Sequence, residues 1–85
     1  MQKPLVLTYH ARVRMAERKL PLSWVEQTAH HPDWIEPEPS EPSVERRFRA
    51  ISDFGGRVLR VACVETDSHI RIITITFDRN ARRKS

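Results

Sequence analysis

The chain has 85 residues, a formal net charge of +4 at pH 7 and one cysteine, Cys63. This length suits one domain with a modest hydrophobic core. Hydrophobic residues make up 39% of the chain and charged residues 31%, which excludes a wholly disordered protein. A single thiol excludes an internal disulfide, and no apolar run approaches the roughly 20 residues that a membrane span needs. We therefore expect a cytoplasmic protein without a membrane partner.

Two short helices are predicted near the N-terminus, each followed by a proline. Thr8 is a suitable N-cap for a helix over about residues 9–19. Ser23 and Glu26 have the spacing of a capping box, which predicts a second helix over about residues 24–31.

Three strands are predicted in the second half of the chain, where β-branched residues are frequent. Their ranges are about 44–51, 57–65 and 69–77. Short turns join them, and the turn at Gly55-Gly56 uses the freedom of glycine to adopt a positive φ. We therefore expect the three strands to form an antiparallel meander.

Residues 33–42 alternate prolines with glutamates, so an exposed acidic loop is expected. Proline donates no backbone hydrogen bond, which excludes a central strand here. Trp34-Ile35 is long enough only for a short strand, and Leu5-Val6-Leu7 fits either a brief edge strand or a hydrophobic staple ahead of the first helix. The predicted fold is α+β, in a single domain over residues 1–85, with two N-terminal helices packed on one face of a three- to four-stranded, mainly antiparallel sheet.

The alternation of side chains predicts which face of the sheet the helices cover. The apolar face would carry Phe48, Leu59, Val61, Cys63, Ile73, Ile75 and Phe77. The open face would carry Arg47, Arg49, Arg60, Thr74 and Thr76, together with Val58, Val64, Ile70 and Ile72. A shift of one residue in register would exchange the two faces.

The segment His10-Ala11-Arg12-Val13-Arg14-Met15-Ala16-Glu17-Arg18 carries the pattern His-Ala-x-x-Arg-Met-x-x-Arg. With Ser23-Trp24-Val25-Glu26 after it, this segment resembles the opening of the domain of unknown function 4258 family. Arg57 to Val61 and Ile72 to Asp78 are similar to strands of that family. The resemblance covers most of the chain, but not the acidic loop.

The order of two helices and a meander is similar to that of the RelE and BrnT toxins of toxin–antitoxin pairs. Several of these small basic proteins cleave RNA without a metal. The resemblance therefore implies a toxin-like ribonuclease, with RNA as substrate and an acidic antitoxin-like protein as partner. Because fold alone is a weak warrant for function, two alternatives stay open. They are a non-catalytic module that binds nucleic acid or an acidic protein, and a subunit of a homodimer.

Metal-independent RNA cleavage requires positive charge that holds the phosphate and a group that moves a proton. Arg47 and Arg49 lie two residues apart on one predicted strand, so both would face the same phosphate. His10 is the candidate acid or base, because histidine titrates near neutral pH. Further binding residues would be Arg14, Arg60, Arg79, Arg82 and Arg83, the last three in a basic tail over residues 79–85.

Each of these candidates also has a purely structural alternative. The arginines would then be a solvated sheet face, and His10 would anchor the first helix. We expect no metal and no other cofactor, since the four histidines lack a tight ligand spacing. Cys63 lies between Ala62 and Val64, and apolar surroundings make a thiol unreactive.

Overall fold

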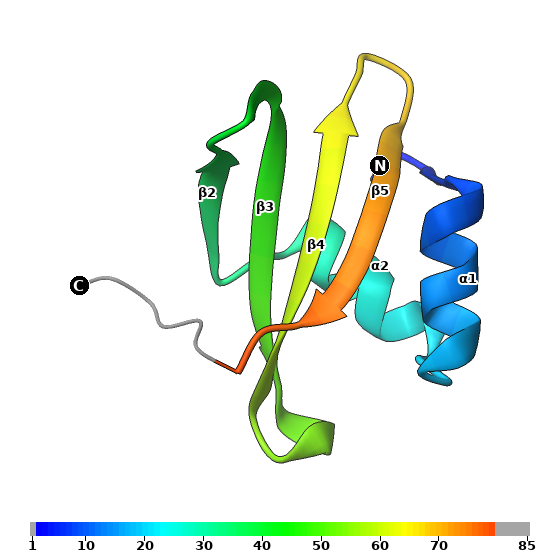
Figure 1. Cartoon of the computed structure of the whole chain (residues 1–85), viewed down its shortest axis with the longest axis vertical. Coiled ribbons are helices and arrows are strands. Elements are labelled where there is room, and N and C mark those ends of the chain that lie inside the picture. The colour runs from blue at the N-terminus through cyan, green and yellow to red at the C-terminus, as the bar shows by residue number, and fades with distance from the viewer. Residues whose placement is uncertain (1, 80–85) are drawn as a thin grey trace.

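The computed structural model describes residues 2–79 and has an α+β fold, as the sequence predicts. Its elements in chain order are β1 (Leu5–Leu7), α1 (Tyr9–Glu17), α2 (Leu22–His30), β2 (Trp34–Glu38), β3 (Glu41–Ile51), a 3-10 turn (Ser52–Phe54), β4 (Arg57–Glu65) and β5 (Ile70–Phe77). The strands form one five-stranded sheet in the order β1-β5-β4-β3-β2 (Figure 1). The meander β3-β4-β5 is therefore confirmed, and one more strand is present than the sequence predicts.

The additional pairing comes from the two edges of the sheet. At one edge, β1 pairs with β5 in parallel. At the other edge, β2 pairs with β3 antiparallel. The brief strand at Trp34-Ile35 therefore continues to Glu38, and β3 already begins at Glu41, so the predicted loop was wrong for residues 36–38 and 41–42. The argument from proline still holds, because β2 is an edge strand and Pro37 occupies no central position.

The first helix begins at the predicted N-cap. The Thr8 hydroxyl accepts a hydrogen bond from the Ala11 N–H group at 3.2 Å and donates one to the Ile73 carbonyl at 3.0 Å. The helix ends at Glu17, two residues earlier than predicted, because Lys19 has a positive φ of 52°. The N–H groups of Lys19 and Leu20 bond back to the carbonyls of Ala16 and Met15, which is a Schellman motif.

The second helix begins earlier than the sequence predicts. Its N-cap is Pro21, which makes no side-chain capping bond, and Ser23 lies inside the first turn. The predicted capping box is therefore wrong. Proline has a fixed φ that suits the entry to a helix, so the chain enters the helix without a polar cap. The helix ends at His30, close to the predicted end.

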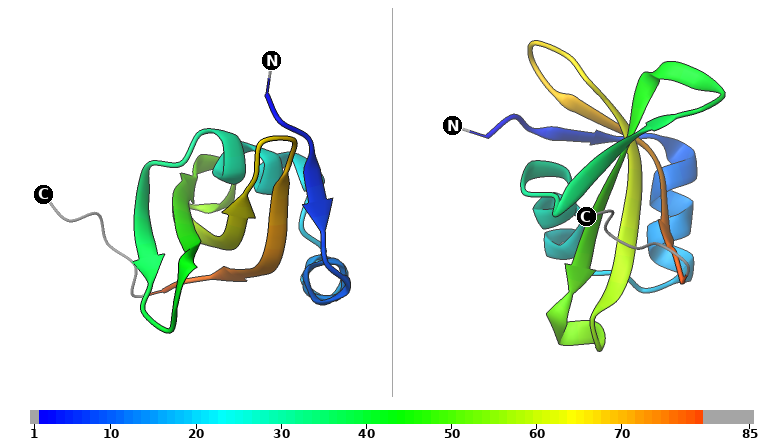
Figure 2. Two further views of the ribbon diagram at one scale, coloured as in Figure 1. Left: turned by 90° about the horizontal axis from the view of Figure 1, so that it is seen from above. Right: turned by 90° about the vertical axis from the view of Figure 1, so that its left-hand side faces the viewer.

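The two helices pack against different parts of the twisted sheet. Helix α2 packs against β3 and β4. Helix α1, which follows β1 directly in the chain, packs against β5 (Figures 1 and 2). Both contribute to one hydrophobic core, whose buried members are Ala11, Leu20, Val25, Ala29, Ile51, Leu59, Val61, Cys63, Ile70, Ile72 and Ile75. Among residues 2–79, no helix is long and apolar enough to cross a membrane.

The predicted faces are correct for β4 and wrong for β3. Leu59, Val61 and Cys63 lie in the core. Arg47 pairs with Val61 across the strands, so Arg47 points toward α2. Phe48 pairs with Arg60 on the opposite face and stacks on Trp34, with ring centroids 4.8 Å apart. The sequence pattern of β3 misleads because its helix-covered face carries arginines.

A β-bulge changes the alternation along β5. Ala62 pairs with Thr74 and Cys63 pairs with Ile72, which leaves Ile73 between them as the extra residue. Ile70 and Ile72 therefore join Ile75 in the core, and the prediction that these two residues face the open side was wrong.

Candidate nucleic-acid interface

Arg47 is a buried residue whose donors bond to the protein itself. Its side chain is about 8% exposed. Nη1 donates to the Ala29 carbonyl at 2.6 Å, and Nη2 donates to Glu65 at 2.7 Å and Glu45 at 3.0 Å. Nε donates to the same Glu45 oxygen at 3.1 Å. The geometry therefore does not favour the predicted contact between Arg47 and a phosphate.

The charges around Arg47 stabilise one another. Burial alone would lower the pKa of Arg47, but hydrogen bonds to Glu65 and Glu45 outweigh it and raise the pKa. Hydrogen bonds from Lys3 and Arg47 lower the pKa of Glu65 to about 2. Arg47 therefore remains charged and Glu65 ionised over the physiological pH range.

The other predicted site residues are dispersed. Arg49 donates to the His31 carbonyl at 2.7 Å, and Arg60 pairs with Asp78 at 3.2 Å on the opposite face. His10 is exposed on α1, and Arg14 is half-buried one turn later. Arg82 and Arg83 lie outside the described residues. The structure thus brings Arg47 and Arg49 together at the end of α2, whereas His10 lies on α1.

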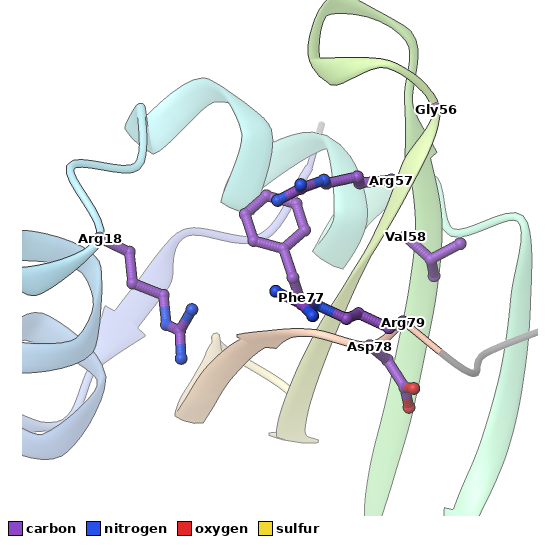
Figure 3. A pocket seen from close by; sticks show the side chains of 7 residues that line it. All are labelled: Arg18, Gly56, Arg57, Val58, Phe77, Asp78 and Arg79. Atoms are coloured by element: carbon purple, nitrogen blue, oxygen red, sulfur yellow. The ribbon is translucent and has the colours of Figure 1, made fainter.

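Three other arginines converge on a pocket of about 600 Å³. Arg18, Arg57 and Arg79 line it, together with Phe77, Asp78, Val58 and Gly56 (Figure 3). We call the site formed by Arg18, Arg57 and Arg79 around Phe77 the arginine pocket. Arg79 belongs to the predicted binding set, whereas Arg18 and Arg57 do not.

The local structure explains how these arginines meet. Arg18 is the C-cap of α1. Arg57 opens β4 directly after Gly55 and Gly56, which both have the predicted positive φ. The Asp78 N–H group donates to the Val58 carbonyl at 3.0 Å, so the pairing of β5 with β4 extends one residue and places Arg79 beside the start of β4.

The arginine pocket has no carboxylate partner for its guanidinium groups within residues 2–79. Within residues 2–79, the arginines that form ion pairs are Arg46, Arg47, Arg49 and Arg60, and none of these belongs to the arginine pocket. Asp78 is the acidic residue in the lining, but its side chain points away from the three guanidinium groups and pairs with Arg60 (Figure 3). The pocket therefore carries positive charge that an anion can neutralise.

Two aromatic rings adjoin Phe77, the ring that lines the pocket. Phe54 is 39% exposed, and its ring centroid lies 5.1 Å from that of Phe77. Trp24 supports Phe54 from α2 at a centroid distance of 5.5 Å. The Arg57 guanidinium carbon lies 4.9 Å from the Phe54 centroid, in a cation–π contact. The partly exposed Phe54 ring and the Arg57 guanidinium thus lie together next to the arginine pocket.

Cysteine and metal chemistry were the other kinds of site considered from the sequence. Burial raises the pKa of Cys63 to about 11, so its thiol is protonated at neutral pH. Within the described part of the chain, no three histidine, cysteine or acidic side chains gather where they could hold a metal ion.

Comparison with known proteins gives a family and no function. No curated protein and no solved structure matches the chain significantly. A family model described as "Domain of unknown function (DUF4258)" matches residues 7–77, which run from the end of β1 to the end of β5. The match includes the motif with Arg18 and also Phe54, Arg57 and Phe77, but it stops before Arg79. The chain therefore belongs to the DUF4258 family of domains of unknown function.

Proposed function

We propose that this protein binds single-stranded RNA, with a phosphate in the arginine pocket and a neighbouring base against Phe54. The observation that carries the proposal is the convergence of Arg18, Arg57 and Arg79, from three separate segments, without carboxylate partners among residues 2–79. Gathering like charges costs free energy unless an anion neutralises them. Arginine suits phosphate because its planar fork donates two parallel hydrogen bonds.

The exposed Phe54 ring favours single-stranded nucleic acid over a duplex as the ligand. Exposed rings bind nucleic acid by stacking on unpaired bases, which a duplex keeps inside. Phe54 offers such a ring, 39% exposed, with the Arg57 guanidinium over it, and a base can stack on a guanidinium plane as well as on a ring. We propose RNA as the nucleic acid because the RelE and BrnT toxins, whose order of helices and strands is similar, include proteins that cleave RNA.

The proposal is limited to binding because the described residues that line the pocket include no histidine, the predicted acid or base. His10 is exposed on α1 and is not among the residues that line the pocket. Asp78 does line it but is engaged by Arg60. Metal-independent cleavage by a toxin-like ribonuclease stays a prediction, which the same samples can test.

Fluorescence anisotropy with a labelled RNA of about ten nucleotides tests the proposal. The informative variant is Arg57→Gln/Arg79→Gln, and the matched control is Arg12→Gln/Arg71→Gln, which removes the same charge from exposed positions outside the pocket. We expect the pocket variant to bind at least about tenfold more weakly, and the control to lose less than about threefold. Equal losses in both variants would overturn the proposal, since binding would then follow net charge alone.

Incubation of the same RNA in excess chelator tests for cleavage. Fragments made by the parent protein but not by Arg57→Gln/Arg79→Gln would extend the proposal to a ribonuclease that uses this pocket. Intact RNA, bound by the parent protein, would limit the function to binding.

A further inference from the structure

The cations of the arginine pocket exceed the charge of a single phosphate inside an RNA strand. The guanidinium groups of Arg18, Arg57 and Arg79 stay charged over the physiological pH range. None of the three forms an ion pair within residues 2–79, and the Asp78 carboxylate in the lining pairs with Arg60. A phosphodiester carries one negative charge, so it neutralises only one of these cations. The pocket therefore suits a ligand group with more negative charge than a phosphodiester has.

A phosphate monoester supplies both more charge and more acceptors. It carries a charge of about −1.5 to −2 at pH 7 and presents three strong acceptor oxygens. A phosphodiester presents one acceptor fewer, because its second ester bond occupies that oxygen. The three arginines come from the end of α1, the start of β4 and the segment after β5, and their side chains lie around the Phe77 ring (Figure 3). Donors from three segments match a group whose oxygens point in three directions.

The surroundings of the pocket also fit the nucleoside that carries such a phosphate. The volume of about 600 Å³ lies in the range of sites that enclose a small ligand. Arg57 lines the pocket, and its guanidinium carbon lies 4.9 Å from the ring centroid of Phe54, which is 39% exposed. A phosphate held by Arg57 thus lies next to a ring on which the base of the same nucleotide can stack.

We propose that the arginine pocket recognises a terminal nucleotide, by its phosphate monoester and its base. The end of an RNA strand and a free nucleotide both offer this chemistry. An internal phosphodiester fits less well, because it brings less charge and because its strand must both enter and leave the pocket. The inference rests on the placement of phosphate and base in the proposed function, and it specifies the ligand.

Isothermal titration calorimetry tests the inference on the full chain, since it needs no label on either end of the RNA. Three RNAs of about ten nucleotides end in a 5′-phosphate, in a 3′-phosphate, or in hydroxyl groups only. The matched control is a longer hydroxyl-ended RNA with the same formal charge as the phosphorylated ones. We expect at least one phosphorylated RNA to bind about tenfold or more tightly than either hydroxyl-ended RNA. Equal affinity of the phosphorylated RNAs and the matched control would overturn the inference and leave the proposed function in place.

Two variants locate the terminal phosphate. In Arg57→Gln/Arg79→Gln, we expect the preference for the phosphorylated end to fall below about threefold. The control Arg12→Gln/Arg71→Gln, at exposed positions outside the pocket, is expected to keep the preference. A preference that persists in Arg57→Gln/Arg79→Gln would overturn the inference, because the end would then bind elsewhere.

Titration with adenosine 5′-monophosphate and with adenosine identifies the source of the terminal nucleotide. Weaker binding of the monophosphate than of the phosphorylated RNA would support the inference with RNA ends as the ligand. Binding of the monophosphate without binding of any RNA would support it with free nucleotides as the ligand and overturn the proposed function. Equal affinity for the monophosphate and adenosine would overturn the inference alone, and absence of binding by every RNA and by the monophosphate would overturn both.

Discussion

The guanidinium of Arg47 on β3 donates a 2.6 Å hydrogen bond to the carbonyl oxygen of Ala29, in the last turn of α2. Arg49 does the same for the His31 carbonyl just beyond the helix, at 2.7 Å. The last carbonyls of a helix lack partners within it and carry partial negative charge, so cations at this end are stabilising. Arg47 and Arg49, which the sequence predicts to be catalytic, therefore bond the end of α2 to strand β3.

Replacement of Arg47 is expected to destabilise the fold. Arg47→Ala removes a buried cation from Glu45, Glu65 and the Ala29 carbonyl, and we expect a loss of about 2–3 kcal/mol in the free energy of unfolding. Arg49→Ala, at a half-exposed position, should cost about 1 kcal/mol. Urea unfolding followed by circular dichroism measures both. Full stability of Arg47→Ala together with loss of RNA binding would instead support the contact between Arg47 and a phosphate that the sequence predicts.

Acid is expected to weaken the same network. A hydrogen bond from Lys3, and a second one from Arg47, lower the pKa of Glu65 from 4.5 to about 2. A carboxylate whose pKa falls on folding stabilises the protein above its unfolded pKa, and this contribution disappears as the pH falls through the folded pKa. The urea midpoint should therefore decrease between about pH 4.5 and about pH 2. Glu65→Gln should show a shallower decrease over that window, and an unchanged profile would contradict the assignment.

Lys19 is a place where a substitution should stabilise the protein. Its φ of 52° lies in the left-handed region, where a residue with a Cβ atom is strained and glycine is not. We expect Lys19→Gly to raise the free energy of unfolding by about 1 kcal/mol, since the Schellman motif retains its hydrogen bonds. Lys19→Ala keeps the strain and serves as the control for the lost charge. A thermal midpoint of Lys19→Gly no higher than that of Lys19→Ala would disprove this account of the helix end.

Thr8 joins the cap of α1 to the bulge of β5. Its hydroxyl accepts from Ala11 and donates to Ile73, so Thr8→Ala should cost about 1–2 kcal/mol, more than an isolated exposed cap. Thr8→Ser keeps the hydroxyl and should retain most of the stability. Equal destabilisation by alanine and serine would show that the methyl group matters and the two hydrogen bonds do not.

Local signals predicted most of the fold. The Thr8 cap, the prolines and the glycine pair of the β3–β4 turn act over a few residues, and the helices and the meander follow from them. The capping box at Ser23 was a local signal that the structure does not use, because Pro21 already starts the helix. Strand β2 was predicted too short because its edge position, which tolerates Pro37, is a property of the whole sheet.

The candidate site was harder to predict because it depends on tertiary structure. The bulge at Ile73 and the arginines on the covered face of β3 reverse a simple alternation of faces. Arg18 and Arg57 are 39 positions apart in the sequence, and only the tertiary structure brings the end of α1 and the start of β4 to one pocket. Two local signals pointed toward them: Arg18 closes the family motif, and Arg57 follows the glycine pair directly.

The most direct measurement of the central claim is an NMR titration of the arginine side-chain Nε–H signals with single-stranded RNA. We predict that the signals of Arg18, Arg57 and Arg79 shift as RNA is added. Those of Arg47 and Arg49 should stay in place, because the Nη1 atoms of these two guanidinium groups already donate to the carbonyls of Ala29 and His31. Shifts confined to Arg47 and Arg49, or an absence of shifts at the arginine pocket while RNA binds, would contradict the account.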